Sequence, residues 1–278
     1  MQANSESGKA VTLFPDDVKE LTRKSKEGTY TLLDVRQPFE YEENHLPGAR
    51  LIPLPELADS LGELDSRKPT IVYCAVGGRS RMAAQFLVHQ GFDEVYHLEG
   101  GIESWEDPTA TGPREFHLKF IRGDETPEEV IMVAYRMEEG LKKFHELMRA
   151  EAEDPDLVVL LTGLIKAEES HERTLLELLS QYGHEGVAME LGSLEDKPEV
   201  MEGGLDAGEF VNGNRRFLQS VSGYLELAMM IETQALDLYL RMAGESRVDS
   251  AKTVLLRIAE EEKAHLAMLA RFMEEKAG

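Results

Sequence analysis

The two halves of the chain carry different hydrophobic patterns. In the first half, short apolar runs alternate with helical segments, and the residues around 79–90 form a helical pattern that Gly91 closes. Buried strands are predicted at residues 30–35, 70–74 and 94–98. This alternation predicts a mostly parallel sheet with helices on its faces, an α/β fold whose ligands bind at the carboxyl ends of the strands.

In the second half, apolar residues recur at intervals of three and four. The pattern extends over four segments, at residues 131–148, 157–178, 218–242 and 251–272. Stripes of this kind are the contact seams of a four-helix bundle. Residues 183–213, rich in glycine and acids, fit a long crossover between two helical pairs.

The join between the halves is rich in turn-forming residues over positions 106–113. We therefore predict two domains, an α/β domain over residues 1–113 and an all-α domain over residues 114–278. Residues 115–121 alternate weakly and are expected to form an extended segment between the two domains.

An internal repeat interrupts the helical stripes of the second half. Glu138 lies thirty residues before Glu168, and Glu168 begins a Glu-x-x-His pair with His171. The same pattern returns 94 residues later, in Glu232, Glu262 and His265. Residues three apart share one face of a helix, so each pair is presented together to the core.

Four carboxylates in one bundle core would repel one another, and each would lose several kcal/mol of hydration. Bound dications remove both costs. The pattern therefore predicts a site for two metal ions. A purely structural polar core, or the relic of a lost metal site, is the alternative.

The six residues resemble the ligand set of the rubrerythrin and ferritin-like di-iron carboxylate proteins, over roughly residues 124–278. The resemblance implies a ferritin-like bundle in which these residues hold two metal ions, with iron expected because carboxylate and imidazole suit it. Two departures stand out. The extra glutamate of rubrerythrins is replaced at the corresponding positions by Met229 and Ala235, and the usual rubredoxin module with paired cysteines is missing.

Two further residues follow the lone glutamates by two helical turns, His145 and Tyr239. We interpret both as hydrogen-bond partners that orient the metal ligands. For His145 a core histidine bonded to a backbone carbonyl is an equal alternative.

In the first half, the chemistry gathers around Cys74, at the end of a predicted strand. A tight loop follows it, made of Ala75, Val76, Gly77 and Gly78, and a helix then opens with Arg79 and Ser80. Backbone N–H groups of such a loop, the helix N-terminus and the arginine all stabilise a thiolate or a bound oxyanion. A buried, inert cysteine is the alternative.

The first half resembles single-domain rhodaneses over about residues 10–112. Four segments carry the resemblance: LDVRQPFEY from Leu33, HLPGA from His45, CAVGGRS from Cys74 and GGIESW from Gly100.

This resemblance implies sulfur transfer. Cys74 would take the outer sulfur of a donor such as thiosulfate, hold it as a persulfide and pass it to a thiol or cyanide-like acceptor, while Arg79 and the loop amides bind the donor. Asp34 and Arg36 look like the family's scaffold charges, and we interpret them as a structural ion pair. The loop is one residue shorter than that of the related phosphatases, which disfavours hydrolysis of phosphate esters.

Composition limits the partners. The chain has 278 residues and a formal net charge of −23, and about −8 of this precedes residue 114 while about −15 follows it. This charge disfavours nucleic acid and anionic membranes as partners. The single cysteine, the lack of a secretion signal and the lack of a long apolar run indicate a cytoplasmic protein. A homodimer and no nucleotide cofactor are expected.

We therefore expect a sulfurtransferase joined to a di-iron site that reduces peroxide or oxygen, or cycles iron. The electron donor is open, and sulfur from the persulfide or a thiol is one hypothesis. The alternative is a persulfide or sulfide sensor whose helical bundle binds metal or dimerises without turnover. Two independent activities on one chain are a third reading.

Overall fold

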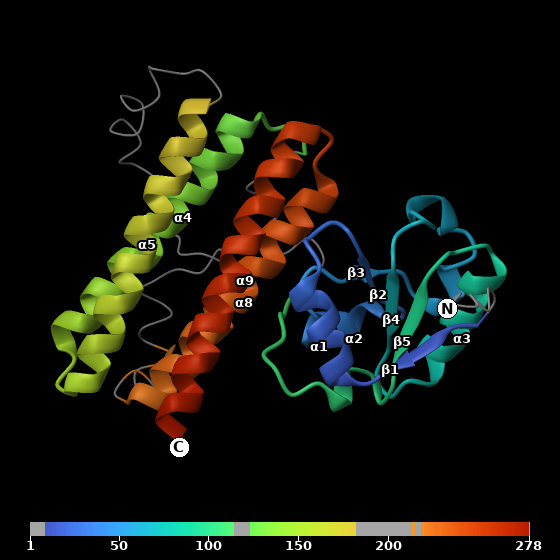
Figure 1. The fold of residues 1–278 in the computed structure, drawn as a ribbon, viewed down its shortest axis with the longest axis horizontal. Coiled ribbons are helices and arrows are strands. Elements are labelled where there is room, and N and C mark those ends of the chain that lie inside the picture. The colour runs from blue at the N-terminus through green and yellow to red at the C-terminus, as the bar shows by residue number, and fades with distance from the viewer. Residues whose placement is uncertain (1–8, 114–122, 182–212, 215–217, 219, 278) are drawn as a thin grey trace, which may run out of the picture. The chain divides into compact units, whose positions relative to one another are not determined.

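The computed structural model describes residues 9–113, 123–181, 213–214, 218 and 220–277. Contacts divide the chain into two compact units, Met1–Phe116 and His117–Gly278 (Figure 1). The predicted domain boundary after residue 113 stays a prediction, because residues 114–122 lie outside the described part. The expected extended segment at 115–121 and, apart from Gly213, the expected crossover at 183–213 also lie outside it.

The first unit is built on a five-stranded parallel sheet in the order β1-β5-β4-β2-β3 (Figure 1). The strands are β1 Val11–Leu13, β2 Thr31–Asp34, β3 Arg50–Leu51, β4 Thr70–Tyr73 and β5 Val95–Leu98. Strand β4 is central and buried along its whole length, as expected for an apolar strand covered on both faces. The predicted parallel α/β fold is confirmed, and the three predicted strands lie within one residue of their expected bounds.

In the described part of this unit, three α-helices and two short 3₁₀ helices lie between the strands, and a third 3₁₀ helix follows β5. They are α1 Pro15–Lys24, α2 Pro38–Glu43, α3 Gly78–His89, η1 Leu54–Glu56, η2 Leu61–Glu63 and η3 Gly101–Ser104. Helix α3 begins one residue before the predicted start, because Gly77 takes a left-handed conformation with φ of 95° and caps it. Glycine adopts this conformation at little cost, so the loop after Cys74 turns directly into the helix.

The second unit is helical in all four segments that the sequence predicted. The helices are α4 Pro127–Glu151, α5 Pro155–Gln181, α8 Val221–Glu245 and α9 Asp249–Ala277. Helix α4 packs along α5 and α8 along α9, and α4 also contacts α9 while α5 contacts α8 (Figure 1). The helical region is thus shown. The ferritin-like connection depends on residues outside the described part and remains a prediction.

Helix α8 starts later than predicted. The expected segment began at Leu218, but Ser220 accepts a hydrogen bond from the backbone N–H of Gly223 at 3.1 Å and starts the helix at Val221. Leu218 is nevertheless buried. Its apolar side chain packs in the core although the residue lies before the start of α8.

Two apolar clusters fill the second unit. One includes Ile131, Leu175 and Leu255, and the other includes Leu161 and Leu225. On each of the four helices, the predicted metal ligands fall between residues of one cluster and residues of the other. The ligand positions therefore form a polar layer between two apolar layers.

Among the described residues, none of the helices combines the length and the apolar character that crossing a bilayer requires.

Candidate functional site

Cys74 directly follows the central strand β4, and its side chain is buried. Its Sγ accepts the backbone N–H of Gly77 at 3.1 Å and lies 3.6 Å from the Ser80 hydroxyl. Ser80 in turn donates to the carbonyl oxygen of Gly77 at 3.1 Å. Of the predicted loop, Gly77 and Ser80 thus contact the sulfur, while Val76 and Gly78 are exposed and Ala75 is half-buried.

The loop is held from the far side by the turn after β5. The N–H groups of Ile102 and Glu103 donate to the carbonyl oxygens of Cys74 and Ala75, at 2.8 and 3.1 Å. Gly101 has a φ of 61°, and a Cβ there would lie 2.3 Å from the Cys74 carbonyl oxygen. Only glycine allows this approach. The carbonyl oxygens that would repel a nearby anion are therefore bonded elsewhere.

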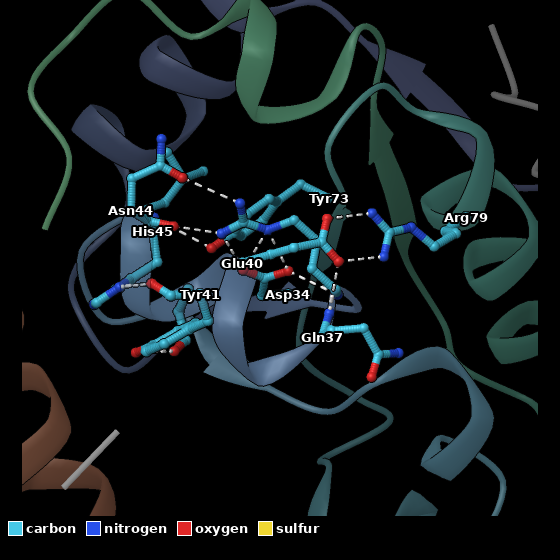
Figure 2. A network of polar contacts seen from close by, with 11 residues as sticks. Asp34, Gln37, Glu40, Tyr41, Asn44, His45, Tyr73 and Arg79 are labelled. Atoms are coloured by element: carbon cyan, nitrogen blue, oxygen red, sulfur yellow. Dashed lines mark hydrogen bonds and ion pairs between the residues drawn. The ribbon is translucent and has the colours of Figure 1, made fainter. Parts of the chain in front are cut away.

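Arg79 lies in the first turn of α3, but its guanidinium is already paired. Its two terminal nitrogens donate to the two carboxylate oxygens of Glu40, at 2.7 and 2.6 Å (Figure 2). The Arg79 hydrogen bond lowers the pKa of Glu40 to about 2, helped by the N–H of Gln37. The same pair raises the pKa of Arg79. A role for Arg79 in binding the donor stays a prediction.

Asp34 and Arg36 form the ion pair that the sequence predicted. Arg36 Nη2 lies 2.7 Å from Asp34 Oδ2, and both side chains are buried. Arg36 also donates to the side chain of Asn44, at 3.1 Å. These bonds tie the end of β2 to the end of α2 (Figure 2).

In the second unit, the polar layer brings together all the predicted metal ligands: Glu138, Glu168, His171, Glu232, Glu262 and His265. In one half of the cluster, Nδ1 of His171 lies 3.4 Å from Oε1 of Glu138 and 3.9 Å from Oε2 of Glu168. Burial and the neighbouring His265 lower the pKa of His171 to about 4. The imidazole is therefore neutral at pH 7, which is the form that binds metals.

The other half repeats this arrangement. Nδ1 of His265 lies 3.2 Å from Oε2 of Glu232 and 3.7 Å from Oε2 of Glu262. The rings of His171 and His265 stack with centroids 4.0 Å apart. Three groups of potential ligand atoms, each within 4.8 Å of one another, share His171, Glu262 or His265. The halves therefore form one continuous cluster.

The donor set fits divalent metal ions. The carboxylates of Glu138, Glu168, Glu232 and Glu262 are all buried. Neither oxygen of Glu168 makes a hydrogen bond within the described structure, and Nε2 of His145 lies 3.5 Å from Oε1. Buried carboxylates ordinarily have such partners, and a metal ion supplies the missing interaction. The ligand assignment itself stays a prediction.

His145 lies beside Glu168 and also has a partner on α8 that the sequence did not predict. Its Nδ1 shares a 2.5 Å hydrogen bond with the hydroxyl of Tyr224, and not with a backbone carbonyl. Burial opposes the charge of Glu168, but the effects of His145, Glu138 and His265 together outweigh it and lower the pKa of Glu168 to about 2. The hydroxyl of Tyr239 points to Sδ of Met137, at 3.9 Å. Tyr239 as a partner of the ligands therefore stays a prediction.

Sequence reasoning missed Glu40, Tyr224 and the ion pair between Lys142 and Glu172. Lys142 and Glu172 each lie one turn beyond a predicted ligand. A search for partners at that spacing would have found them. Glu40 is 39 residues from its partner Arg79, and Tyr224 is 79 residues from His145. No local sequence pattern predicts contacts at such separations.

A family model described as a rhodanese-like domain matches residues 17–108. The chain is 42% identical over 84 residues to the thiosulfate sulfurtransferase GlpE of Pseudomonas syringae pv. syringae (strain B728a), which covers 30% of this chain and 76% of that protein. It is 45% identical over 74 residues to the uncharacterized protein YqhL of Bacillus subtilis (strain 168), covering 27% of this chain and 59% of that protein.

Matches among solved structures include a rhodanese-like domain protein from Staphylococcus aureus, with 28% identity and a TM-score of 0.34, covering 36% of this chain and 97% of the other. A rhodanese-related protein from Thermoplasma volcanium has 36% identity and a TM-score of 0.31, covering 34% and 89%. The sequence matches fall on the unit that carries Cys74 and its loop. Through residues 17–108, this chain belongs to the family of proteins with a rhodanese-like domain.

Proposed function

We propose that the first unit is a sulfurtransferase and that Cys74 is its sulfur carrier. The observation that carries the proposal is the closed loop after β4, which directs the Gly77 N–H to Sγ at 3.1 Å. This N–H donates to the sulfur that would attack the donor and carry the transferred atom. The name of the Pseudomonas relative, a thiosulfate sulfurtransferase, supports thiosulfate or a related compound as the donor.

In the proposed reaction, the Cys74 thiolate attacks the outer sulfur of thiosulfate. A new S–S bond forms on Cys74, the S–S bond of thiosulfate breaks, and sulfite leaves with its electron pair. A thiol or cyanide then takes the outer sulfur and restores the thiolate. The Gly77 N–H lies where it would stabilise negative charge on the sulfur, and the Ser80 hydroxyl, which donates to the Gly77 carbonyl oxygen, holds the loop in this shape.

A thiosulfate and cyanide assay on the full chain tests this proposal. We expect thiocyanate and sulfite to form in equal amounts with the wild-type chain and not with Cys74→Ser. The matched control is Ser60→Ala, since Ser60 starts η2 and lies outside both the loop that contacts the sulfur and the turn that holds this loop. Equal, background turnover by wild type and Cys74→Ser would contradict the proposal.

We propose for the second unit a site for two metal ions, iron in the first place, in a ferritin-like bundle. The gathering of six buried or partly buried carboxylate and imidazole groups between two apolar layers supports it. A pair of iron ions, when bound, supplies the electrons to reduce peroxide or dioxygen.

The chain's own residues would do three things at this site. Four carboxylates offset the charge of the ions, and His171 and His265 each add a neutral nitrogen. His145, whose Nε2 lies 3.5 Å from Oε1 of Glu168, would orient that carboxylate toward the ions. The apolar layers on both sides exclude water, which strengthens every electrostatic interaction inside.

Elemental analysis of the chain, purified without oxygen and without added metal, tests the metal proposal. We expect about two iron ions per chain. A folded, metal-free chain that does not take up Fe²⁺ would contradict it. Iron that is bound but does not react with peroxide would instead support the sensor hypothesis, in which the bundle binds metal or dimerises without turnover.

We place both proposed activities, sulfur transfer and metal chemistry, in the reducing cytoplasm, since the chain has a single cysteine.

A further inference from the structure

The arginines near residues 75–80, which we call the sulfur loop, are paired with carboxylates, unlike those of an ordinary anion-binding site. The first turn of α3 carries two arginines, and each is paired with a carboxylate. Arg79 binds Glu40, and Arg81 lies 2.9 Å from Glu99. The nearby Arg36 is paired with Asp34. Arg36, Arg79 and Arg81 are therefore each paired with a carboxylate.

The pair between Glu40 and Arg79 is the tightest of those at the loop. Both terminal nitrogens of the guanidinium bond both oxygens of the carboxylate, at 2.7 and 2.6 Å, in the parallel geometry of a strong arginine–carboxylate pair (Figure 2). Arg79 thus presents its fork to Glu40. An oxyanion donor would have to compete with Glu40 for it.

Glu40 is fixed on its own side as well. Its Oε2 accepts the backbone N–H of Gln37 at 3.0 Å, at the start of α2. Its side chain is 19% exposed and that of Arg79 is 34% exposed. Glu40 is therefore held at the N-terminal turn of α2, where the helix dipole also favours its charge.

We propose that Glu40 sets the charge of the donor that this site prefers. With Arg79 neutralised, the loop offers an oxyanion the backbone N–H groups at the N-terminus of α3 and little net positive charge. Such a site discriminates against a doubly charged donor and favours a singly charged one. This inference rests on the proposed sulfurtransferase activity and assigns to it a class of substrate, sulfane-sulfur donors of low charge.

Two sulfur donors that react in the same way but differ in charge allow the charge preference of the site to be measured. Thiosulfate carries two negative charges and leaves as sulfite. Methanethiosulfonate carries one and leaves as methanesulfinate, after the same attack by Cys74 on the outer sulfur. The ratio of kcat/KM for thiosulfate to kcat/KM for methanethiosulfonate therefore reports the charge preference, and is insensitive to a general loss of activity.

The test is a set of four full-length chains: wild type, Glu40→Gln, Arg79→Gln and the double variant. A glutamine at position 40 keeps an oxygen for the Gln37 N–H. The charge of Glu40 repels a dianion with about twice the energy with which it repels a monoanion, so removing that charge favours the dianion more. We expect Glu40→Gln to raise the ratio about fivefold, Arg79→Gln to lower it by a similar factor, and the double variant to return to the wild-type ratio.

The control is Glu99→Gln, which frees the more exposed Arg81 and is expected to change the ratio less than twofold, within the range of screened surface charges. A ratio that stays constant across the four chains would overturn the inference and leave sulfur transfer standing. No persulfide in any chain with either donor would overturn the proposed function, and this inference with it. If Glu40→Gln fails to fold, Arg79→Gln and the salt dependence of the wild-type ratio decide.

Discussion

The sulfur loop of the first unit and the acidic cluster of the second unit both handle charge, by opposite means. The loop is one continuous segment whose Gly77 N–H donates to a single sulfur, and its Arg79 is already paired with Glu40. The cluster is assembled from four helices and concentrates unbalanced carboxylates in a buried layer. A balanced site of the first kind is stable by itself, whereas one of the second kind calls for a counter-charge from outside the chain.

The largest effect is expected at the sulfur itself. Cys74→Ser removes the nucleophile, and a serine hydroxyl is not ionised at neutral pH, so single-turnover transfer from thiosulfate should fall by more than about a thousandfold. Metal binding by the second unit should not change. The measurement is sulfite release in a rapid-mixing experiment. A loss of metal in this variant would show that the two sites are not separable in the way this comparison assumes.

Glu262→Gln should weaken metal binding by the second unit and at the same time stabilise the metal-free chain. It removes one of four buried carboxylates, so it should lower bound metal to about one ion per chain or less. In the metal-free chain, it relieves repulsion and should raise the free energy of unfolding by about 1–2 kcal/mol. Metal analysis and urea unfolding measure the two quantities.

The control is Glu169→Gln, at an exposed position on α5, and it should change neither quantity. A decrease in the stability of the metal-free Glu262→Gln chain, equal to the decrease in the metal-bound chain, would indicate a structural polar core and not a metal site.

Tyr224→Phe tests the hydrogen bond from Tyr224 to His145, the histidine that lies beside Glu168. It leaves Nδ1 of a buried histidine without its 2.5 Å hydrogen bond, which should cost about 1–2 kcal/mol of stability in the metal-free chain. Tyr135→Phe, at a half-buried position on α4, is the comparison and should cost less. Urea unfolding followed by helical circular dichroism gives both values, and equal costs would mean that Tyr224 contributes only its ring.

The smallest effect concerns pH. Because Arg79 lowers the pKa of Glu40 to about 2, the ion pair adds stability that is fully present above the ordinary carboxyl pKa and is lost as pH falls toward 2. The pair is partly exposed, so the contribution should be under about 1 kcal/mol. Fluorescence of Trp105, the only tryptophan in the sequence, follows the first unit. Wild type and Glu40→Gln should differ at neutral pH and converge near pH 2, and a constant difference would exclude this linkage.

The two regions also differ in how far the sequence could predict them. The loop is contiguous, so Cys74, its two following glycines and Ser80 could be recognised together, and the strand before them is a plain apolar run. The cluster became readable only because Glu138, Glu168 and His171 recur at a fixed interval. Without the repeat, each glutamate would have looked like an ordinary helix surface position.

What the sequence could not predict are contacts whose partners come from elements far apart. Glu40 sits on a different helix from Arg79, and Tyr224 on a different helix from His145. Neither pair has a characteristic spacing, because the distance depends on how the elements pack and not on any helical or strand period. The start of α8 was misplaced for a related reason, since Leu218 packs in the core from outside the helix.

Native mass spectrometry of the full chain, purified without oxygen and then given a small excess of thiosulfate, tests the account most directly. We predict a mass that contains about two iron ions and one added sulfur atom, with the sulfur lost on treatment with cyanide and absent in Cys74→Ser. A chain that stays at the mass of the bare polypeptide, with neither sulfur nor metal, would contradict the account at both sites.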